Sequence, residues 1–427
     1  MKRRLLAVGL MAVLVLAAGC SSEKKETKEE ELYFQGELSE EEMNQSHLSL
    51  NLTEKTSVDA DITPYSKYRD GLNSYLTEKA GNHETIDIKA FEKSPEIFGK
   101  SFADIENKVM EIGKGTFEDE KRKVRYKKGS SNITLSVPYA GADGKKYVLE
   151  FTQETDKKLR QKGVTLSLTE KKNEEEYDNH DFSIEMLSDI SLGQNIRSWL
   201  NMGYLNSEET ELDFLSREEA AGQMRTFISE VTGMELAAEC DCVMVSKNNY
   251  DTLAELNFPD KEAPSLEKEF YVGFFYPVLD GLEWKSAYFS TSYAANDEEE
   301  KDFYKREKLL LQPDEMAVCI GEQGLGEFEL SNMVKVTDIY EEKKEICPID
   351  EILRGIQEYF SGNSADGTLI PIKVINISLV YAGDVTEDYK SITKPYWCVQ
   401  YNKEIWSGGE KGEIYFDAGT GDLISDY

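Results

Sequence analysis

Residue types that carry hydrolytic chemistry are sparse in this chain. Its three histidines, His47, His83 and His180, all stand among polar residues. The motifs G-x-S-x-G, H-E-x-x-H and C-x-x-C and the phosphate-binding loop G-x-x-x-x-G-K-S/T do not occur. The glycine-bounded segment 362–367 holds a serine at another spacing and is typical of a helix-to-strand loop. The sequence therefore predicts no catalytic residue, no cofactor and no metal.

Acidic residues are abundant, so a carboxylate pair of the glycosidase kind has many candidates and no assignable position. Asp417 and Asp422 flank a Gly-rich turn and could offer oxygens to calcium, but their spacing departs from the EF-hand rule. A hairpin turn accounts for both residues. The acidic run at 296–300, N-D-E-E-E, is typical of a solvated loop.

Five cysteines follow Cys20, at positions 240, 242, 319, 347 and 398, so at least one thiol stays free or pairs between chains. Cys240 and Cys242 stand two apart in an expected strand, which points both to one face and could hold a soft metal. Neither a second cysteine pair nor a histidine lies nearby in the sequence. Buried thiols that pack as small hydrophobic groups are the favoured interpretation.

The clearest chemical signal is at Cys20. Lys2, Arg3 and Arg4 precede an uncharged apolar run, Leu5–Ala18, and Gly19-Cys20 follows. This pattern resembles a bacterial lipoprotein signal, with residues 1–19 as the signal peptide and Cys20 as the lipid attachment residue. The apolar run is short for a membrane crossing, which takes about 20 residues. We expect a lipid-anchored protein on the extracytoplasmic face of the cell membrane.

The formal net charge of −33 makes nucleic acid an improbable partner, because phosphate binding requires a basic surface. Residues 20–61 are rich in Ser, Glu, Lys and Thr, and this composition predicts a disordered acidic tether. Within it, residues 30–36 (E-E-L-Y-F-Q-G) resemble a tobacco etch virus protease site, either an engineered remnant or a coincidence. They are left out of the fold prediction.

The remaining chain predicts an α+β fold with antiparallel sheets, each covered by a helix. An N-terminal domain at 62–172 would begin with a helix through Tyr65, Tyr68, Leu72 and Tyr75, which have helical spacing. A second helix would be capped by Ser101. Strands around 133–137, 147–151 and 164–168 would follow, with Asp143-Gly144 as a turn between the first two.

Two tandem αβββ modules are expected in the second half, at 210–292 and at 314–427, the latter with an added hairpin. Ser216 and Glu219 form a capping box that starts the first module's helix, and Gly233 ends it. Asp280-Gly281 predicts a tight turn. Aromatic residues at 270–276 could form a peptide- or glycan-binding face, although core packing is favoured.

Residues 210–427 also carry a resemblance. A capped helix, an aromatic strand ending in Asp280-Gly281, and the final segments Y-W-C-V-Q-Y and I-Y-F-D-A-G-T-G-D-L-I resemble PepSY-type modules and the extracytoplasmic regulators YycH and YycI. The whole chain resembles an uncharacterised family of lipoproteins from Gram-positive gut Clostridia. The resemblance implies a non-catalytic cell-surface regulator or binding module.

We therefore expect a non-catalytic, lipid-anchored protein that binds a membrane protein partner. A surface hydrolase using a carboxylate pair and a solute- or peptide-binding lipoprotein remain as alternatives. The hydrolase requires a cleft with two acids of perturbed pKa. The solute-binding protein would require two α/β lobes with parallel sheets.

Overall fold

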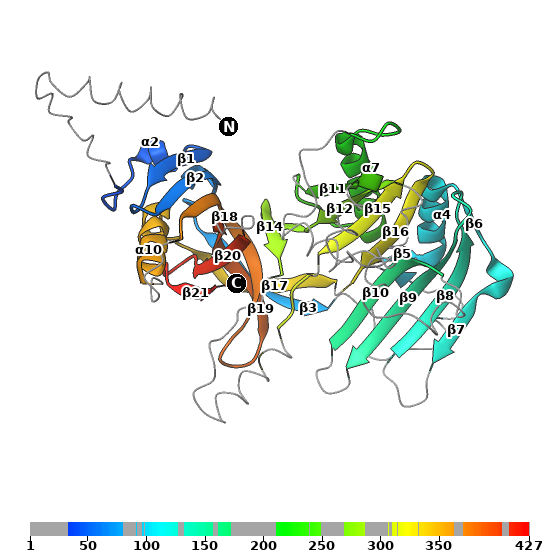
Figure 1. The fold of residues 1–427 in the computed structure, drawn as a ribbon. Coiled ribbons are helices and arrows are strands. Elements are labelled where there is room, and N and C mark those ends of the chain that lie inside the picture. Colours follow the sequence, from blue (N-terminus) through cyan, green and yellow to red (C-terminus); the bar gives the residue numbers. More distant parts are fainter. Residues whose placement is uncertain are drawn as a thin grey trace, which may run out of the picture.

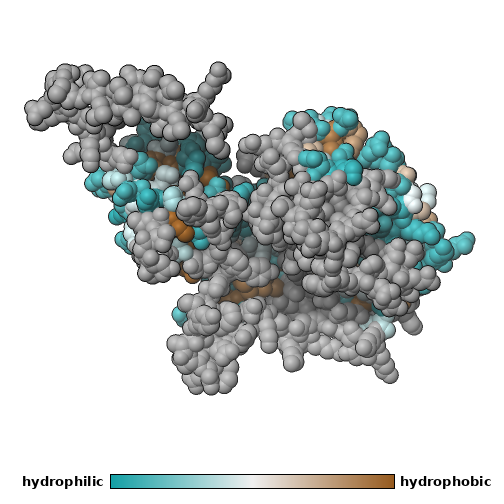
Figure 2. Space-filling view, in the orientation of Figure 1, coloured by the Kyte–Doolittle hydropathy of each residue, from teal (hydrophilic) through white to brown (hydrophobic). Residues whose placement is uncertain are grey.

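A computed structural model describes residues 33–79, 91, 96–97, 99–126, 132–156, 161–171, 211–238, 240–248, 269–286, 306, 310–313, 315–331, 333–362, 370–403 and 410–426. Most of them belong to two large β-sheets that lie in neighbouring lobes (Figure 1). On the face shown in Figure 2, most of the described surface is hydrophilic. Within these ranges, no helix has the length and apolar composition needed to span a bilayer.

The ten-stranded sheet joins segments from the two ends of the described chain. Its main path runs β1-β2-β18-β19-β20-β21, while β3 pairs with β19 and β17, and β14 pairs with β18 and β13. β18 is parallel to β2 and β14, and the other pairs are antiparallel. The strands are β1 (His47–Asn51), β2 (Thr56–Ile62), β3 (Leu72–Lys79), β13 (Val278–Leu279), β14 (Leu282–Lys285), β17 (Val334–Lys344), β18 (Ile372–Val385), β19 (Ser391–Lys403), β20 (Glu410–Asp417) and β21 (Leu423–Asp426).

The nine-stranded sheet is antiparallel throughout and uses the middle of the chain. Its path runs β11-β12-β15-β16-β10-β9-β8-β6, with β7 also paired to β8. The strands are β6 (Thr116–Phe117), β7 (Lys123–Tyr126), β8 (Asn132–Ala140), β9 (Lys146–Asp156), β10 (Gln161–Glu170), β11 (Asp241–Val245), β12 (Phe270–Phe275), β15 (Met316–Gly321) and β16 (Gly324–Leu330). A separate pair is formed by β4 (Glu96–Ile97) and β5 (Lys100–Ser101).

Helices lie against both sheets. The described residues include α2 (Glu40–Met43), α4 (Phe102–Gly113), α7 (Arg217–Thr232) and α10 (Ile349–Gly362), with 3₁₀ turns η1 (Tyr65–Lys67) and η2 (Asp119–Lys121). Ser101 caps α4, and Ser216 with Glu219 forms the capping box of α7, as the sequence predicts. Gly233 ends α7 at a left-handed φ of 73°, a conformation that favours glycine.

Each sheet has its own apolar core. The buried stripes of α4 and α7, including Phe102, Val109, Met224 and Phe227, pack on the nine-stranded sheet. In the other lobe the stripe of α10 packs on alternate residues of β19 and β20. Gly355 permits this approach, because a Cβ there would come within 2.6 Å of the Phe416 ring. Phe274 and Phe275 are buried, so core packing is correct for these aromatic residues of β12.

The expected fold class is wrong. The protein is mostly β, and its strands form two large sheets instead of separate helix-covered αβββ modules. β11, β12 and β15 follow α7 and share one sheet, but β14 crosses to the other. Similarly, β18, β19 and β20 follow α10, but their sheet also takes in β1, β2 and β3. Side-chain alternation predicts which face of a strand is buried but does not determine which strands pair with it, so it does not divide the strands between the two sheets.

The N-terminal part also differs from the expected division. The tether assigned to residues 20–61 by composition contains β1 and all of β2 but its last residue, and both strands belong to the ten-stranded sheet. The expected domain at 62–172 contributes β3 to that sheet and β6–β10 to the nine-stranded sheet. The helix expected from Tyr65 is wrong, since η1 ends at Lys67 and β3 begins at Leu72. Pairing with β17 and β19 outweighs the helical spacing of the apolar residues.

The hairpin of β13 and β14 links the lobes, because it follows β12 of the nine-stranded sheet and pairs with β18 of the ten-stranded sheet. Its predicted turn is present, with φ of 50° at Asp280 and 76° at Gly281. The Tyr75 hydroxyl donates to Oδ2 of Asp280 at 2.5 Å, and the Tyr381 hydroxyl donates to the same oxygen at 3.0 Å. We call Tyr75, Asp280 and Tyr381 the clasp.

We predict that Asp280→Ala lowers the free energy of unfolding by about 1–3 kcal/mol, because two buried tyrosines lose a charged acceptor and alanine is strained at positive φ. Urea unfolding would measure this change. Asp280→Asn is the matched control: asparagine keeps an oxygen and tolerates the left-handed conformation, so its loss should be smaller. Equal stability of Asp280→Ala and the wild type would show that the clasp contributes nothing.

Candidate binding site

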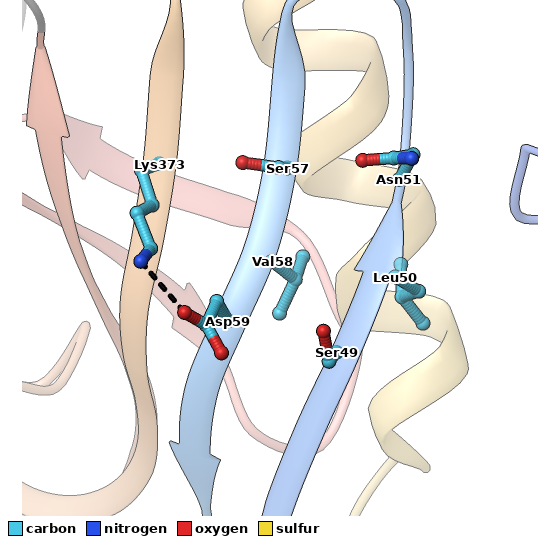
Figure 3. Close-up of a pocket in the computed structure, with 7 residues that line it drawn as sticks. All are labelled: Ser49, Leu50, Asn51, Ser57, Val58, Asp59 and Lys373. Atoms are coloured by element: carbon cyan, nitrogen blue, oxygen red, sulfur yellow. Dashed lines mark ion pairs between the residues drawn. The ribbon is translucent and has the colours of Figure 1, made fainter.

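A shallow open depression of about 430 Å³ lies on β1, β2 and β18. Figure 3 shows its lining, which consists of Ser49, Leu50, Asn51, Ser57, Val58, Asp59 and Lys373. Antiparallel pairing sets Ser49 opposite Asp59 and Asn51 opposite Ser57. Parallel pairing of β2 with β18 sets Lys373 beside Ser57. The depression is therefore assembled from segments more than 300 positions apart in the sequence.

Strand alternation explains why this face is polar. In β2, Val58, Ala60 and Ile62 are buried in the core, whereas Asp59 and Asp61 are exposed. In β1, Leu48 is buried and its neighbours His47 and Ser49 are exposed. The small side chains of Ser49 and Ser57 leave room between the larger charged groups. The acidic composition of residues 20–61 predicts a tether and hides these strands, although the alternation of residues 57–62, S-V-D-A-D-I, is typical of a strand.

Charged groups along the depression are paired with one another. Lys373 Nζ lies 2.6 Å from Asp59 Oδ2, and the His47 ring lies between two carboxylates, with Nε2 3.0 Å from Asp59 and Nδ1 2.9 Å from Asp61. Hydrogen bonds to Asp61 and Asp59 raise the pKa of His47. Hydrogen bonds from Lys373 and His47 lower the pKa of Asp59. The raised pKa favours protonated His47, and the ion pairs hold the charged side chains of His47, Asp59 and Lys373 against one another.

Between the charged groups, the depression offers neutral hydrogen-bonding groups. Ser49 and Ser57 present hydroxyls and Asn51 presents an amide, each of which can donate and accept. No side-chain hydrogen bond joins them to other described residues. The arrangement suits a polar ligand or an extended polar segment of a partner.

The histidine interaction makes a measurable prediction. His47 should titrate above its ordinary pKa of 6.5. Since the folded-state pKa is raised, its stabilising contribution is fully present below the unfolded-state value and is lost as the pH rises through the folded-state value. NMR titration of the His47 ring would measure the midpoint, and Asp61→Asn should lower it by removing the largest cause. An unchanged midpoint in Asp61→Asn would contradict the assignment.

A second polar cluster, partly buried, lies on β18, β19 and β20 beside the buried side chains of Val380, Cys398 and Tyr415. Lys394 Nζ lies 3.0 Å from Asp384 and 2.8 Å from Asp417, and the Tyr396 hydroxyl donates to Asp384 at 2.9 Å. Burial lowers the pKa of Lys394, but the two carboxylates outweigh it and raise the value. The cluster ties three adjacent strands together and leaves its ammonium group ionised.

The turn after β20 positions the carboxylate of Asp417 and closes through the backbone of Asp422, whose carbonyl accepts from the Asp417 amide at 2.9 Å. Asp417 Oδ1 accepts hydrogen bonds from the amides of Gly419 and Thr420, and its Oδ2 pairs with Lys394. Burial alone would raise the pKa of Asp417, but these interactions outweigh it and lower the value. Oδ1 is thus engaged in the turn and Oδ2 in the ion pair with β19. Within the described ranges, His, Cys, Asp and Glu form no group of three or more arranged for a metal.

In the described part of the chain, every carboxyl group with a shifted pKa has a lowered one. The pKa values of Glu42, Asp59, Glu118, Glu219, Asp388 and Asp417 are all lowered, in each case by hydrogen bonds from neighbouring residues. A glycosidase general acid requires a raised pKa, so none of these six suits that role.

Other residues proposed from the sequence are distributed widely. Cys20, His83, His180 and the acidic run 296–300 lie outside the described residues. Cys240 and Cys242 are partly buried, and Cys319, Cys347 and Cys398 are buried, all as free thiols. Burial raises the pKa to about 12 for Cys242, Cys347 and Cys398.

We predict that these three thiols are at least about 10-fold slower to react with a disulfide reagent at pH 8 in the native protein than in the unfolded chain. A thiol with a pKa near 12 supplies little thiolate at that pH, and burial also blocks the reagent. Mass-spectrometric mapping after timed labelling, with a guanidinium-unfolded control, would measure each site. Equal rates in both states would contradict the burial of the thiols.

Comparison with solved structures shows the fold of the chain. No protein-family model and no curated protein matches the chain. The chain is similar in structure to an uncharacterized protein from Eubacterium rectale, with a TM-score of 0.55, 14% identity, and coverage of 90% of this chain and 96% of that one. An alignment with the Bacillus megaterium YpeB C-terminal domain has a TM-score of 0.30 and 9% identity, and covers 76% of this chain and 95% of that one. The first similarity shows a shared fold, and the second is too weak to add to it.

Proposed function

We propose that this protein is a non-catalytic, lipid-anchored module on the extracytoplasmic face of the membrane, where it binds a membrane protein partner. The observation that carries the proposal is the polar depression on β1, β2 and β18, whose neutral groups are available to a ligand while its charged groups are paired.

The lipoprotein signal at Cys20 supports the location. The resemblance of residues 210–427 to PepSY-type modules and to YycH and YycI supports a regulatory role. The carboxyl groups of Asp59 and Asp417, whose pKa values are lowered, are unsuited to be the general acid of a carboxylate-pair hydrolase. The largely antiparallel sheets favour it over a solute-binding lipoprotein of the two-lobed α/β kind.

In-cell crosslinking of the full lipoprotein followed by mass spectrometry tests this proposal. We expect one membrane protein to be enriched with the wild type and lost with Cys20→Ala, which cannot carry the lipid. Ser49→Trp should reduce the enrichment about 10-fold or more by filling the depression, whereas an exposed strand residue of the other lobe, changed in Thr169→Trp, should leave it unchanged. Equal enrichment with all variants would reject the proposed function.

A further inference from the structure

The depression lies where the described chain first joins the fold. Tyr33 forms a parallel bridge with Asn51, and the Phe34 amide donates to the Asn51 carbonyl at 2.9 Å. Phe34 and Leu38 pack against the core of the ten-stranded sheet. Asn51 also lines the depression, so the attachment point and the depression share a residue.

Chain length then limits the distance to the membrane. Tyr33 follows Cys20 by 13 residues. A fully extended chain spans at most about 3.3–3.6 Å per residue, which gives about 45 Å from the lipid-bearing residue to Tyr33. The root-mean-square separation for a flexible chain of this length is only about 20 Å. The chain between Cys20 and Tyr33 therefore holds the edge of the depression at Asn51 within about 45 Å of the lipid-bearing residue, and on average much nearer.

The other lobe extends away from this attachment point. β1 and α2 lie at one end of the molecule, and β7 lies at the opposite end (Figure 1). A compact chain of this size is about 55 Å across. Tyr126, which ends β7 and is 44% exposed, thus marks the end remote from the tether.

We propose that the depression is the membrane-proximal binding site of the protein and that its occupant is a polar extracytoplasmic segment of a membrane protein. This inference rests on the proposed lipid anchor. The tether allows the depression to reach a partner segment that lies close to the bilayer. The backbone and side-chain amides of such a segment can hydrogen-bond to the hydroxyls of Ser49 and Ser57 and to the amide of Asn51. A lipid phosphate is disfavoured, because Asp59 and Asp61 are adjacent and Lys373 is already paired.

Energy transfer on vesicles tests the orientation. The full lipidated chain carries a fluorophore at Ser49→Cys or at Tyr126→Cys, and the lipid headgroups carry the acceptor. We expect transfer from position 49 to be at least about twofold more efficient than from position 126, given the size of the molecule. Inserting 20 Gly/Ser residues after Ser22 should reduce transfer from position 49. The labelled wild type measures background from the native thiols.

The outcomes separate the two proposals. Failure of the lipidated protein to float with vesicles would reject the anchor and the orientation together. Flotation with equal or reversed transfer would reject the orientation alone. A photo-crosslinking residue at position 49 in native membranes should give products with extracytoplasmic peptides of an integral membrane protein, and the same residue at position 126 should not. Products with lipid alone at position 49 would overturn the assigned occupant.

Discussion

β18 is the strand on which the other features depend. It pairs with β2 and β14 in parallel and with β19 in antiparallel orientation, so one continuous ladder gathers the first strands, the crossing hairpin and the last strands. Each functional or structural feature takes one residue from it: Lys373 lines the depression, Tyr381 joins the clasp and Asp384 joins the Lys394 cluster. Displacing β18 would therefore disrupt all three.

The ten-stranded sheet pairs strands that are far apart in the sequence. β2 and β18 are separated in sequence by the whole nine-stranded sheet. Parallel pairing across so long a loop is entropically costly, and the buried α10 stripe with Trp397 and Phe416 offsets that cost through apolar burial. The depression depends on the same pairing of β2 with β18, because its two sides come from these two distant segments.

The ten-stranded sheet separates stability from recognition by position. One face is apolar and contacts α10, and the other carries exposed ion pairs and neutral polar groups at the depression but a buried apolar cluster farther along β18–β20, formed by Val380, Ala382, Tyr396, Cys398 and Tyr415. Exposed ion pairs contribute little to folding free energy, so the rim of the depression can be shaped for recognition at small cost to stability. The clasp then holds the crossing hairpin against this same sheet.

The sequence by itself determined the local features. The caps at Ser101 and Ser216, the turns at Gly144 and Gly281 and the strands 132–140, 146–156 and 161–170 follow from side-chain chemistry and alternation within a few residues. The tertiary structure alone decided that β1 and β2 are strands and that β3 replaces a helix, since pairing with distant segments outweighs local composition. It also decided the depression, because the contact between Asp59 and Lys373 exists only when β18 lies beside β2.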